Sequence, residues 1–168
     1  MAEPMHPKTR SRLLSLLEKD SSLLIFEVMI KTGLRTHELW NMELREGGLF
    51  IHACKGSVDH LCPLPDAFIA RLQCHWADLV SDMRRYSHAS YNRILRFRWD
   101  AFRSSHAFLT PYSLHSLRSA YAIQVYQQTK DVILVQQLLG HRAITSTMRY
   151  VRMTLIEENR DAILKAIS

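Results

Sequence analysis

Three side chains in the first third of the chain are of the types that bind or protonate phosphate oxygens. Arg35 follows Gly33 in the stretch TGLRTHEL, and Glu38 comes three residues later. A planar guanidinium binds two phosphate oxygens at once, and a carboxylate one helical turn away can hold it in place. Lys55 lies in the turn sequence CKGS, where a flexible ammonium can protonate a leaving oxygen. Taken singly, these residues would indicate only a surface ion pair and a solvated turn.

The C-terminal half supplies the groups that an attack on phosphorus requires. His115 and Arg118 occur three residues apart in HSLRSAY, so a helix places them on one face. His141 directly follows Gly140, and Tyr150 lies nine residues after His141. A phenol ionises with a pKa of about 10, so its attack at neutral pH needs a base within reach and a positive field. Each of these residues is unremarkable singly, but together with the first three they form an unusual combination.

In this order and spacing, the motifs resemble the signature set of the tyrosine recombinase, or phage integrase, family. The resemblance extends from about Leu13 to the C-terminus and includes seven positions. It implies two arginines that clamp a phosphate, a lysine general acid, two histidine partners, a tyrosine nucleophile and an acidic supporting residue. We expect His115 to accept the phenol proton and His141 to donate a hydrogen bond to a phosphate oxygen. In the order of these roles, the residues are Arg35 and Arg118, Lys55, His115 and His141, Tyr150, and Glu38.

The resemblance implies a site-specific DNA recombinase that cuts and rejoins duplex DNA through a 3′-phosphotyrosine intermediate, with no metal or other cofactor. It also implies duplex DNA as the partner, four protomers assembled on two sites, and room for an accessory DNA-bending protein. Two other functions stay open at this point. One is nicking and religation of a single duplex, as in type IB topoisomerases, and the other is DNA binding by a non-catalytic regulator of the same fold. The filled catalytic positions argue against the regulator.

A second basic cluster lies in the stretch RRYSHASYNRILRFRWDAFRSSH, residues 84–106. Arg93, Arg96 and Arg103 can share one side of a predicted helix, with Arg98 further round. Contact with DNA phosphates explains these arginines about as well as solvation does. For Phe97 and Trp99 in the same stretch, burial in the core is favoured over stacking on a ligand. The arginines predicted to bind DNA are Arg93, Arg96, Arg98 and Arg103.

Composition restricts the class of protein further. The chain has 168 residues and a formal net charge of +6, which favours one compact domain with a polyanionic partner such as nucleic acid. The longest apolar stretch, SSLLIFEVMI, is too short to cross a bilayer and contains Glu27, and no signal peptide precedes it. Three cysteines leave one unpaired in any disulfide scheme, which favours a reducing compartment. These features predict a cytoplasmic, DNA-associated protein without a membrane partner.

Hydrophobic periodicity predicts a mainly α-helical fold with a small three-stranded antiparallel β-sheet at one edge. The resemblance implies that this is the catalytic-domain fold of tyrosine recombinases. Two turn signals between Met42 and Pro65 define the sheet, and Lys55 is expected at the tip of its second hairpin. Helices are expected over residues 8–19, about 21–32, 35–42, 67–83, 90–102, 113–129 and 132–139, from about 145, and over 155–167.

Three pairs of histidine and cysteine residues raise the alternative of a structural zinc site. Alternation along a strand places each His-x-Cys pair on one side, but the hairpin register decides whether the pairs meet. Buried cysteines and incidental histidines explain the pattern adequately, so no metal site is predicted. The pairs are His52 and Cys54, His60 and Cys62, and Cys74 and His75.

The whole chain, residues 1–168, is expected to be a single catalytic domain that ends in a tail helix over about 155–167. Members of the family generally carry an N-terminal core-binding domain that closes around the other face of DNA, and this domain is expected to be absent here. Either the sequence is the catalytic domain of a longer protein, or it resembles the single-domain fimbrial-switch invertases. The tail helix is expected to pack on a neighbouring subunit, as in the family, or on its own subunit.

Overall fold

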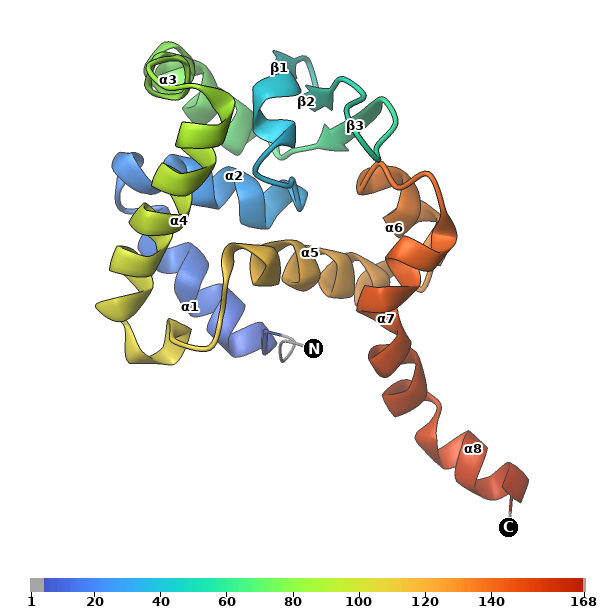
Figure 1. Cartoon of the computed structure of the whole chain (residues 1–168). Coiled ribbons are helices and arrows are strands. Elements are labelled where there is room, and N and C mark those ends of the chain that lie inside the picture. The colour runs from blue at the N-terminus through green and yellow to red at the C-terminus, as the bar shows by residue number, and fades with distance from the viewer. Residues whose placement is uncertain (1–4, 168) are drawn as a thin grey trace.

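The computed structural model describes residues 5–167, which form a mainly helical fold with one small sheet (Figure 1). The predicted fold class is therefore confirmed. In chain order the elements are α1 (Pro7–Leu17), the 3-10 helix η1 (Ser21–Leu23), α2 (Leu24–Thr32), the 3-10 helix η2 (Glu38–Asn41), β1 (Met42–Arg45), β2 (Gly48–Ile51), β3 (His60–Pro63), α3 (Asp66–Arg84), α4 (His88–Ser104), the 3-10 helix η3 (Ala107–Leu109), α5 (Leu114–Thr129), α6 (Val132–Leu138), α7 (Ile144–Glu158) and α8 (Arg160–Ile167).

Two predicted helix boundaries differ from the structure for local reasons. The helix expected over residues 35–42 is only the short η2, because the backbone becomes extended at Met42, where β1 begins. The tail helix expected from Leu155 begins later, since α7 continues through Glu158. Asn159 ends α7, and its side-chain amide donates to the carbonyl oxygen of Leu155 at 2.8 Å.

The sheet is antiparallel with the strand order β1-β2-β3. Leu49 pairs with Cys62 and Ile51 pairs with His60, and these four side chains are buried. Strand β3 packs against α6, so the loop between β2 and β3 lies over the turn that joins α6 to α7 (Figure 1). The sheet thereby brings the Lys55 turn close to the segment that contains His141.

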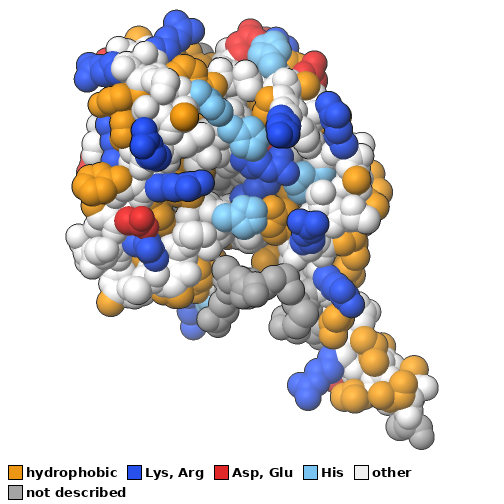
Figure 2. Space-filling view, in the orientation of Figure 1, with side chains coloured by type: hydrophobic (Ala, Val, Ile, Leu, Met, Phe, Trp, Pro, Cys, Tyr) orange, Lys and Arg blue, Asp and Glu red, His pale blue; other side chains and the backbone are white. Residues whose placement is uncertain are grey.

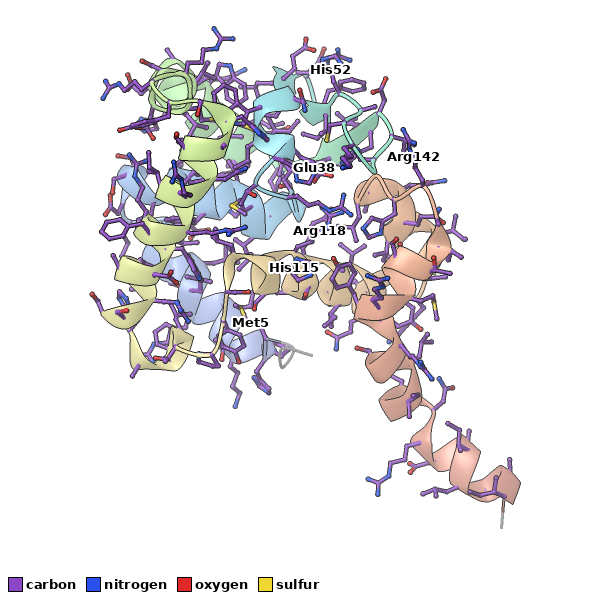
Figure 3. The ribbon with its side chains drawn as sticks, in the orientation of Figure 1. Met5, Glu38, His52, His115, Arg118 and Arg142 are labelled. Atoms are coloured by element: carbon purple, nitrogen blue, oxygen red, sulfur yellow. The ribbon has the colours of Figure 1, made fainter. Side chains whose placement is uncertain are left out.

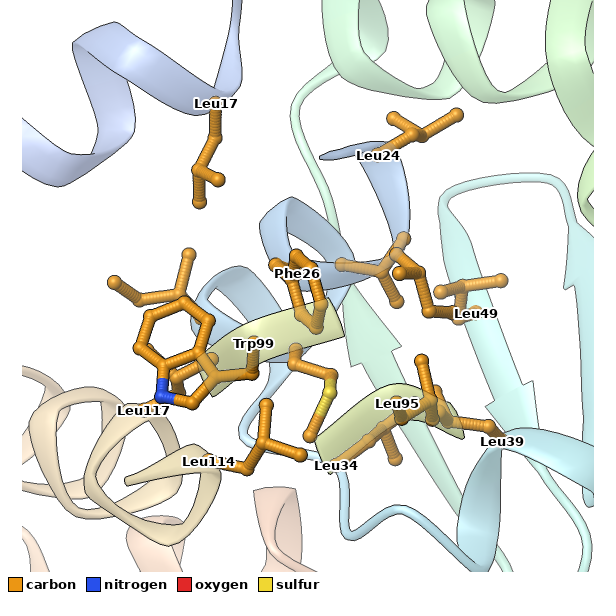
Figure 4. Close-up of a cluster of buried hydrophobic side chains, with 14 of the residues drawn as sticks. Leu17, Leu24, Phe26, Leu34, Leu39, Leu49, Leu95, Trp99, Leu114 and Leu117 are labelled. Atoms are coloured by element: carbon orange, nitrogen blue, oxygen red, sulfur yellow. The ribbon is translucent and has the colours of Figure 1, made fainter. Parts of the chain in front are cut away.

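The larger part of the core surrounds α2, which is apolar on nearly every side (Figure 4). Phe26 of α2 packs edge-on against Trp99 of α4, with 5.3 Å between the ring centroids. The indole N–H of Trp99 donates to the carbonyl oxygen of Tyr112 at 2.9 Å, so no buried donor is lost. The prediction of burial is confirmed for Trp99 and wrong for Phe97, which is 75% exposed.

A smaller apolar cluster joins α5, α6 and α7. Helix α5 contributes to both clusters, and Arg118 lies between a residue of the first, Leu117, and a residue of the second, Tyr121. This position buries Arg118 at the junction of the two clusters. The members of the smaller cluster are Tyr121, Ala122, Tyr126, Val135, Leu139 and Val151.

Helix α8 extends away from the body of the molecule after the break at Asn159 (Figure 1). Its apolar residues Ile163, Leu164 and Ile167 are exposed. Within residues 5–167, none of the helices combines the length and the apolar character that crossing a bilayer requires.

Candidate active site

Six of the seven predicted site residues come together where α5, the turn after α2, the turn after α6 and helix α7 meet (Figure 3). On the face shown in Figure 2, histidine, arginine and lysine side chains gather around a hollow in this region. The seventh residue, Lys55, is exposed in the turn between β2 and β3. The six residues are Arg35, Glu38, His115, Arg118, His141 and Tyr150.

Glu38 is fully buried and joins the two arginines. It accepts hydrogen bonds from the backbone N–H of Arg35 at 2.7 Å, from the guanidinium of Arg35 at 2.7 Å, and from Nη1 of Arg118 at 3.0 Å. Burial alone would raise the pKa of the Glu38 carboxyl, but Arg118 and Arg35 outweigh it and hold the pKa below its usual range. The predicted supporting position is therefore a carboxylate that fixes both guanidinium groups.

Arg118 is a buried cation whose two terminal nitrogens are both held by the protein. Besides Glu38, Nη1 donates to the carbonyl oxygen of Gly33 at 2.6 Å. Nη2 donates to the carbonyl oxygen of Leu139 at 2.9 Å and lies 2.9 Å from Nε2 of His141. Burial lowers the pKa of Arg118 and Glu38 opposes this, but an arginine stays charged at neutral pH. The guanidinium is thus fixed in orientation before any phosphate arrives.

Gly33 makes the first of these contacts possible. It ends α2 in the left-handed region at φ +70°, which turns its carbonyl oxygen toward Arg118. A Cβ atom at this position would come within 2.6 Å of the ring of Tyr121 and 2.8 Å of Leu139. Both the backbone conformation and the close packing therefore require glycine in the TGLR motif.

His141 is buried between Arg118 and Thr147. Since a guanidinium only donates, Nε2 of His141 accepts, and the ring proton is on Nδ1, 2.8 Å from the Thr147 hydroxyl. Burial, Arg118 and Arg35 lower the pKa of His141 to about 4, so the imidazole is neutral at pH 7. The sequence predicts that His141 donates a hydrogen bond to a phosphate oxygen. In this structure, however, Nε2 of His141 accepts a hydrogen bond from Arg118.

Tyr150 lies beside both histidines. Its hydroxyl is 3.4 Å from Nε2 of His115, and its ring stacks on the ring of His141 with 5.9 Å between centroids and 10° between planes. Partial burial, Arg118 and Arg35 lower the pKa of His115, which keeps this imidazole neutral and able to accept a proton at pH 7. The distance is long for a hydrogen bond but within the range that tightens when a substrate binds.

The turn that contains Lys55 borders the same site. Cys54, the preceding residue, has its Sγ within 4.8 Å of ligand atoms of His37 and Glu38. Lys55 itself is exposed, as a residue that reaches toward a bound DNA strand would be. The predicted position of Lys55 in the second hairpin loop is therefore confirmed, while its role as a general acid stays a prediction.

A cleft of about 460 Å³ opens beside the two arginines of the site. Arg35, Arg118 and His115 line it, and Arg96 of α4 lines it as well. Arg93, one turn earlier on α4, is exposed like Arg96. These two α4 arginines thus add positive charge beside the cleft.

The other two arginines predicted to bind DNA are engaged within the chain. Arg98 makes a two-pronged ion pair with Asp82 of α3, at 2.5 and 3.1 Å. Arg103 binds Asp100 at 2.7 Å and the carbonyl oxygen of Thr110 at 2.6 Å. These contacts connect α4 to α3 and to the segment before α5.

One group of potential metal ligands occurs among the residues that the structure describes. His37, Glu38 and Cys54 bring one ligand atom each within 4.8 Å of one another. The Glu38 carboxylate, however, already accepts hydrogen bonds from Arg35 and Arg118, and a cation would have to displace one of them. The Glu38 carboxylate therefore binds the two arginines rather than a metal ion.

The histidine and cysteine pairs weighed as zinc ligands have separate surroundings. His52 binds Glu43 at 3.1 Å, and Nδ1 of His60 lies 2.8 Å from a carbonyl oxygen of its own loop. Cys62 is buried, and burial raises the pKa of its thiol to about 12, whereas Cys74 is exposed. Within the described residues the sheet register does not assemble these pairs into one ligand set.

Three contacts within the site were not foreseen from the sequence. One feature of the sequence could have indicated the contact between Thr147 and His141. Thr147 precedes Tyr150 by three residues, so the two side chains share a face of α7. No feature of the sequence indicates that the carbonyl oxygens of Gly33 and Leu139 bind Arg118. Every residue has a carbonyl oxygen, and only the fold determines its direction.

Comparison with solved structures shows the fold class of this chain. The crystal structure of XerA recombinase matches with a TM-score of 0.67 and 19% identity, covering 96% of this chain and 65% of that one. The XerH site-specific recombinase bound to palindromic difH substrate matches with a TM-score of 0.63 and 18% identity, covering 96% and 52%. The fold is that of tyrosine recombinase catalytic domains.

The chain belongs to the phage integrase family, whose family model matches residues 5–155. Tyrosine recombinase XerA of Pyrococcus furiosus is 24% identical over 159 residues, which are 85% of this chain and 54% of the relative. Tyrosine recombinase XerC of Myxococcus xanthus is 27% identical over 149 residues, 77% of this chain and 49% of the relative. The chain spans about half the length of these curated relatives.

Proposed function

We propose that this chain is the catalytic part of a site-specific DNA recombinase in which Tyr150 attacks a DNA phosphate. The observation that supports this best is the position of the Tyr150 hydroxyl, 3.4 Å from a neutral histidine, His115, and beside the buried Arg118. Family membership supports the same chemistry, and so do relatives named tyrosine recombinases.

In the first half of the reaction, Oη of Tyr150 forms a bond to phosphorus and the bond from phosphorus to the 5′ oxygen breaks. His115 accepts the phenol proton. Arg35 and Arg118, fixed by Glu38, neutralise the charge that builds on the non-bridging oxygens in the transition state. The positive field of two fixed guanidinium groups performs the part that a metal ion performs in other phosphoryl transfers.

Departure of the 5′ oxygen requires a proton, because an alkoxide is a poor leaving group. Lys55 is the proposed donor, on a turn that borders the site. The product is a 3′-phosphotyrosine, which conserves the energy of the broken phosphodiester. Reversal with a 5′ hydroxyl from another duplex transfers the strand without a nucleotide cofactor.

Duplex DNA is the proposed substrate, with Arg93 and Arg96 as backbone contacts beside the cleft. Structural neighbours include the Tn1549 transposon integrase in complex with transposon right end DNA and XerH bound to difH. We further propose that protomers assemble on paired sites as a tetramer and that α8 docks on a neighbouring protomer. Its exposed Ile163, Leu164 and Ile167 would be covered there.

The test uses nicked duplexes carrying a sequence that the protein selects from a random duplex library. The proposal expects a covalent adduct at the 3′ end of the cleaved strand and transfer of that strand to a second duplex. Tyr150→Phe should form neither product. Plasmid relaxation without strand transfer would replace the recombinase by a topoisomerase-like activity, and selective DNA binding with neither product would indicate a regulator.

A further inference from the structure

The turn that contains Lys55 is braced internally. The N–H of Ser57 donates to the carbonyl oxygen of Cys54 at 2.9 Å, which closes a four-residue turn with Lys55 and Gly56 at its centre. The N–H of Cys54 in turn donates to the hydroxyl oxygen of Ser57 at 3.1 Å. Because Lys55 lies two residues from Ser57 inside this closed turn, the position of Ser57 sets the position of the Lys55 backbone.

The braced turn is docked on the segment between α6 and α7. Ser57 forms an isolated antiparallel bridge with His141, and the N–H of Val58 donates to the carbonyl oxygen of Gly140 at 3.0 Å. Gly140 lies at φ +61°, and a Cβ there would come within 2.4 Å of the imidazole of His60. The His60 imidazole and the positive φ therefore both require glycine at position 140, where the two segments meet.

One side chain reaches across this contact from the α6–α7 segment. Nε of Arg142, the residue after His141, donates to the carbonyl oxygen of Ser57 at 3.2 Å (Figure 3). Ser57 is fully buried, whereas Arg142 is exposed. A charged donor makes a stronger hydrogen bond to a carbonyl than a neutral one does, so this contact adds to the backbone bridge.

We propose that Arg142 is a positioning residue for the general acid: it holds the Ser57 carbonyl and thereby keeps the Lys55 turn closed over the site. This inference rests on the proposed function. It assigns to Arg142 a positioning role in addition to its contribution to the positive charge of the surface. In that function His141 contacts a phosphate oxygen, and Lys55 protonates the 5′ oxygen that leaves the same phosphate. We call the contacts among Ser57, Gly140 and Arg142 the clasp. The clasp holds the backbone of the Lys55 turn beside the backbone at His141.

If the general acid is misplaced, the cleavage rate falls only for a leaving group that needs a proton. A loss of folding or of DNA binding slows cleavage whatever the leaving group is. When the 5′ oxygen of the scissile phosphate is replaced by sulfur, the leaving group is a thiolate, whose conjugate acid has a pKa of about 8.5. Such a group departs without being protonated. Defects in Lys55 or in its position should therefore disappear on the 5′-bridging phosphorothiolate, while defects elsewhere in the site remain.

The experiment compares single-turnover cleavage of matched oxygen and sulfur duplexes by the full chain. Lys55→Ala serves as the reference for a lost acid. We expect Arg142→Ala to cleave the oxygen duplex roughly tenfold more slowly than the wild type and the sulfur duplex within about twofold of it. Arg142→Lys, which retains a charged donor, should fall between the wild type and Arg142→Ala. Arg152→Ala removes an exposed charge from α7 without touching the clasp and should leave the ratio of the two rates unchanged.

Equal slowing of both duplexes by Arg142→Ala, or no slowing of either, would overturn the positioning role. A wild-type chain that cleaves neither duplex would instead refute the proposed function itself. Thermal unfolding of Arg142→Ala within about one degree of the wild type is expected, because the side chain is exposed. The outcomes thus separate failure of this inference from failure of the function on which it rests.

Discussion

Thr147 precedes Tyr150 by one turn of α7, and its hydroxyl lies 2.8 Å from Nδ1 of His141. The helix that contains the proposed nucleophile, Tyr150, therefore also holds the histidine on which the Tyr150 ring stacks. A hydroxyl can accept a hydrogen bond or donate one, so Thr147 can support either neutral tautomer of His141. With the present tautomer Nε2 accepts from Arg118, and with the other it would donate to a phosphate oxygen.

Thr147→Val should slow DNA cleavage roughly tenfold to a hundredfold, because valine keeps the shape but removes the hydroxyl that supports both tautomers. Thr147→Ser retains the hydroxyl and should stay within about threefold of the wild type. Single-turnover cleavage rates at saturating protein measure both effects. A valine variant that cleaves as fast as the serine variant would show that the hydroxyl has no part in the reaction.

Buried His141 should make the protein sensitive to acid. Its pKa is lowered to about 4, and an imidazole in the unfolded chain titrates near 6.5, so protons bind the unfolded state first. This stabilisation is complete above pH 6.5 and is lost as the pH falls toward 4, by up to about 3 kcal/mol. Chemical denaturation at pH 7.5 and pH 4.5 measures the loss. His141→Gln, which cannot titrate, should lose less stability over this interval, and an equal loss would assign the acid sensitivity to other groups.

His115 should set the acid limb of the cleavage rate. The partial burial of His115 and the two arginines lower its pKa, so the neutral base persists below pH 6.5. We expect the rate to stay level from pH 7.5 to 6.5 and to fall at lower pH, with the fall absent in His115→Gln at a much reduced rate. A half-maximal rate reached above pH 6.5 would contradict this assignment of the base.

Glu38→Gln should destabilise the fold as well as the site. The substitution removes the negative charge between Arg35 and the buried Arg118, at an expected cost of about 2–4 kcal/mol. For a chain of this size, that corresponds to a fall in melting temperature of roughly 5–15 °C. Glu18→Gln is the matched control, because Glu18 pairs with Lys31 at the surface and is 51% exposed. Similar melting temperatures for the two variants would refute the role of Glu38 as the bridge.

Helix α8 should contribute to assembly on DNA rather than to the fold of one protomer. Leu164 is 49% exposed, so Leu164→Glu should leave thermal unfolding within about one degree of the wild type. It should reduce the fraction of complexes that join two DNA sites, measured by sedimentation. Leu61→Glu places the same charge at an exposed apolar residue of β3 and serves as the control. Normal assembly by the Leu164 variant would argue that α8 packs on its own protomer.

The side chains that meet in the candidate site could be selected from the sequence because their types and order are unusual in combination. Arginine, histidine, lysine, tyrosine and glutamate at seven ordered positions allow few other interpretations. Glu38 does contact Arg35 as expected, and it also binds Arg118. The contacts that depend on backbone geometry could not be predicted. The carbonyl oxygens of Gly33 and Leu139 hold Arg118 only because a glycine cap and a helix end turn them toward it.

The errors in the predicted fold have equally local causes. Residues 35–42 have helical spacing, but the backbone extends into β1 at Met42 and leaves room only for a short 3-10 helix. Phe97 and Trp99 lie in one aromatic-basic stretch, and the sequence holds a signal that separates them. Tyr91 and Leu95 precede Trp99 at four-residue spacing and form the buried stripe of α4, while Phe97 falls on the opposite side.

The identity of the nucleophile is tested most directly by mass spectrometry of the trapped protein–DNA adduct. Nuclease digestion leaves a short nucleotide on the protein, and trypsin cleaves after Arg149 and Arg152, so the peptide of interest is Tyr150–Arg152. The proposed mechanism predicts the nucleotide mass on Tyr150 of this peptide through a 3′ phosphate, and no adduct from Tyr150→Phe. A nucleotide on any other residue, or an adduct that persists in Tyr150→Phe, would contradict it.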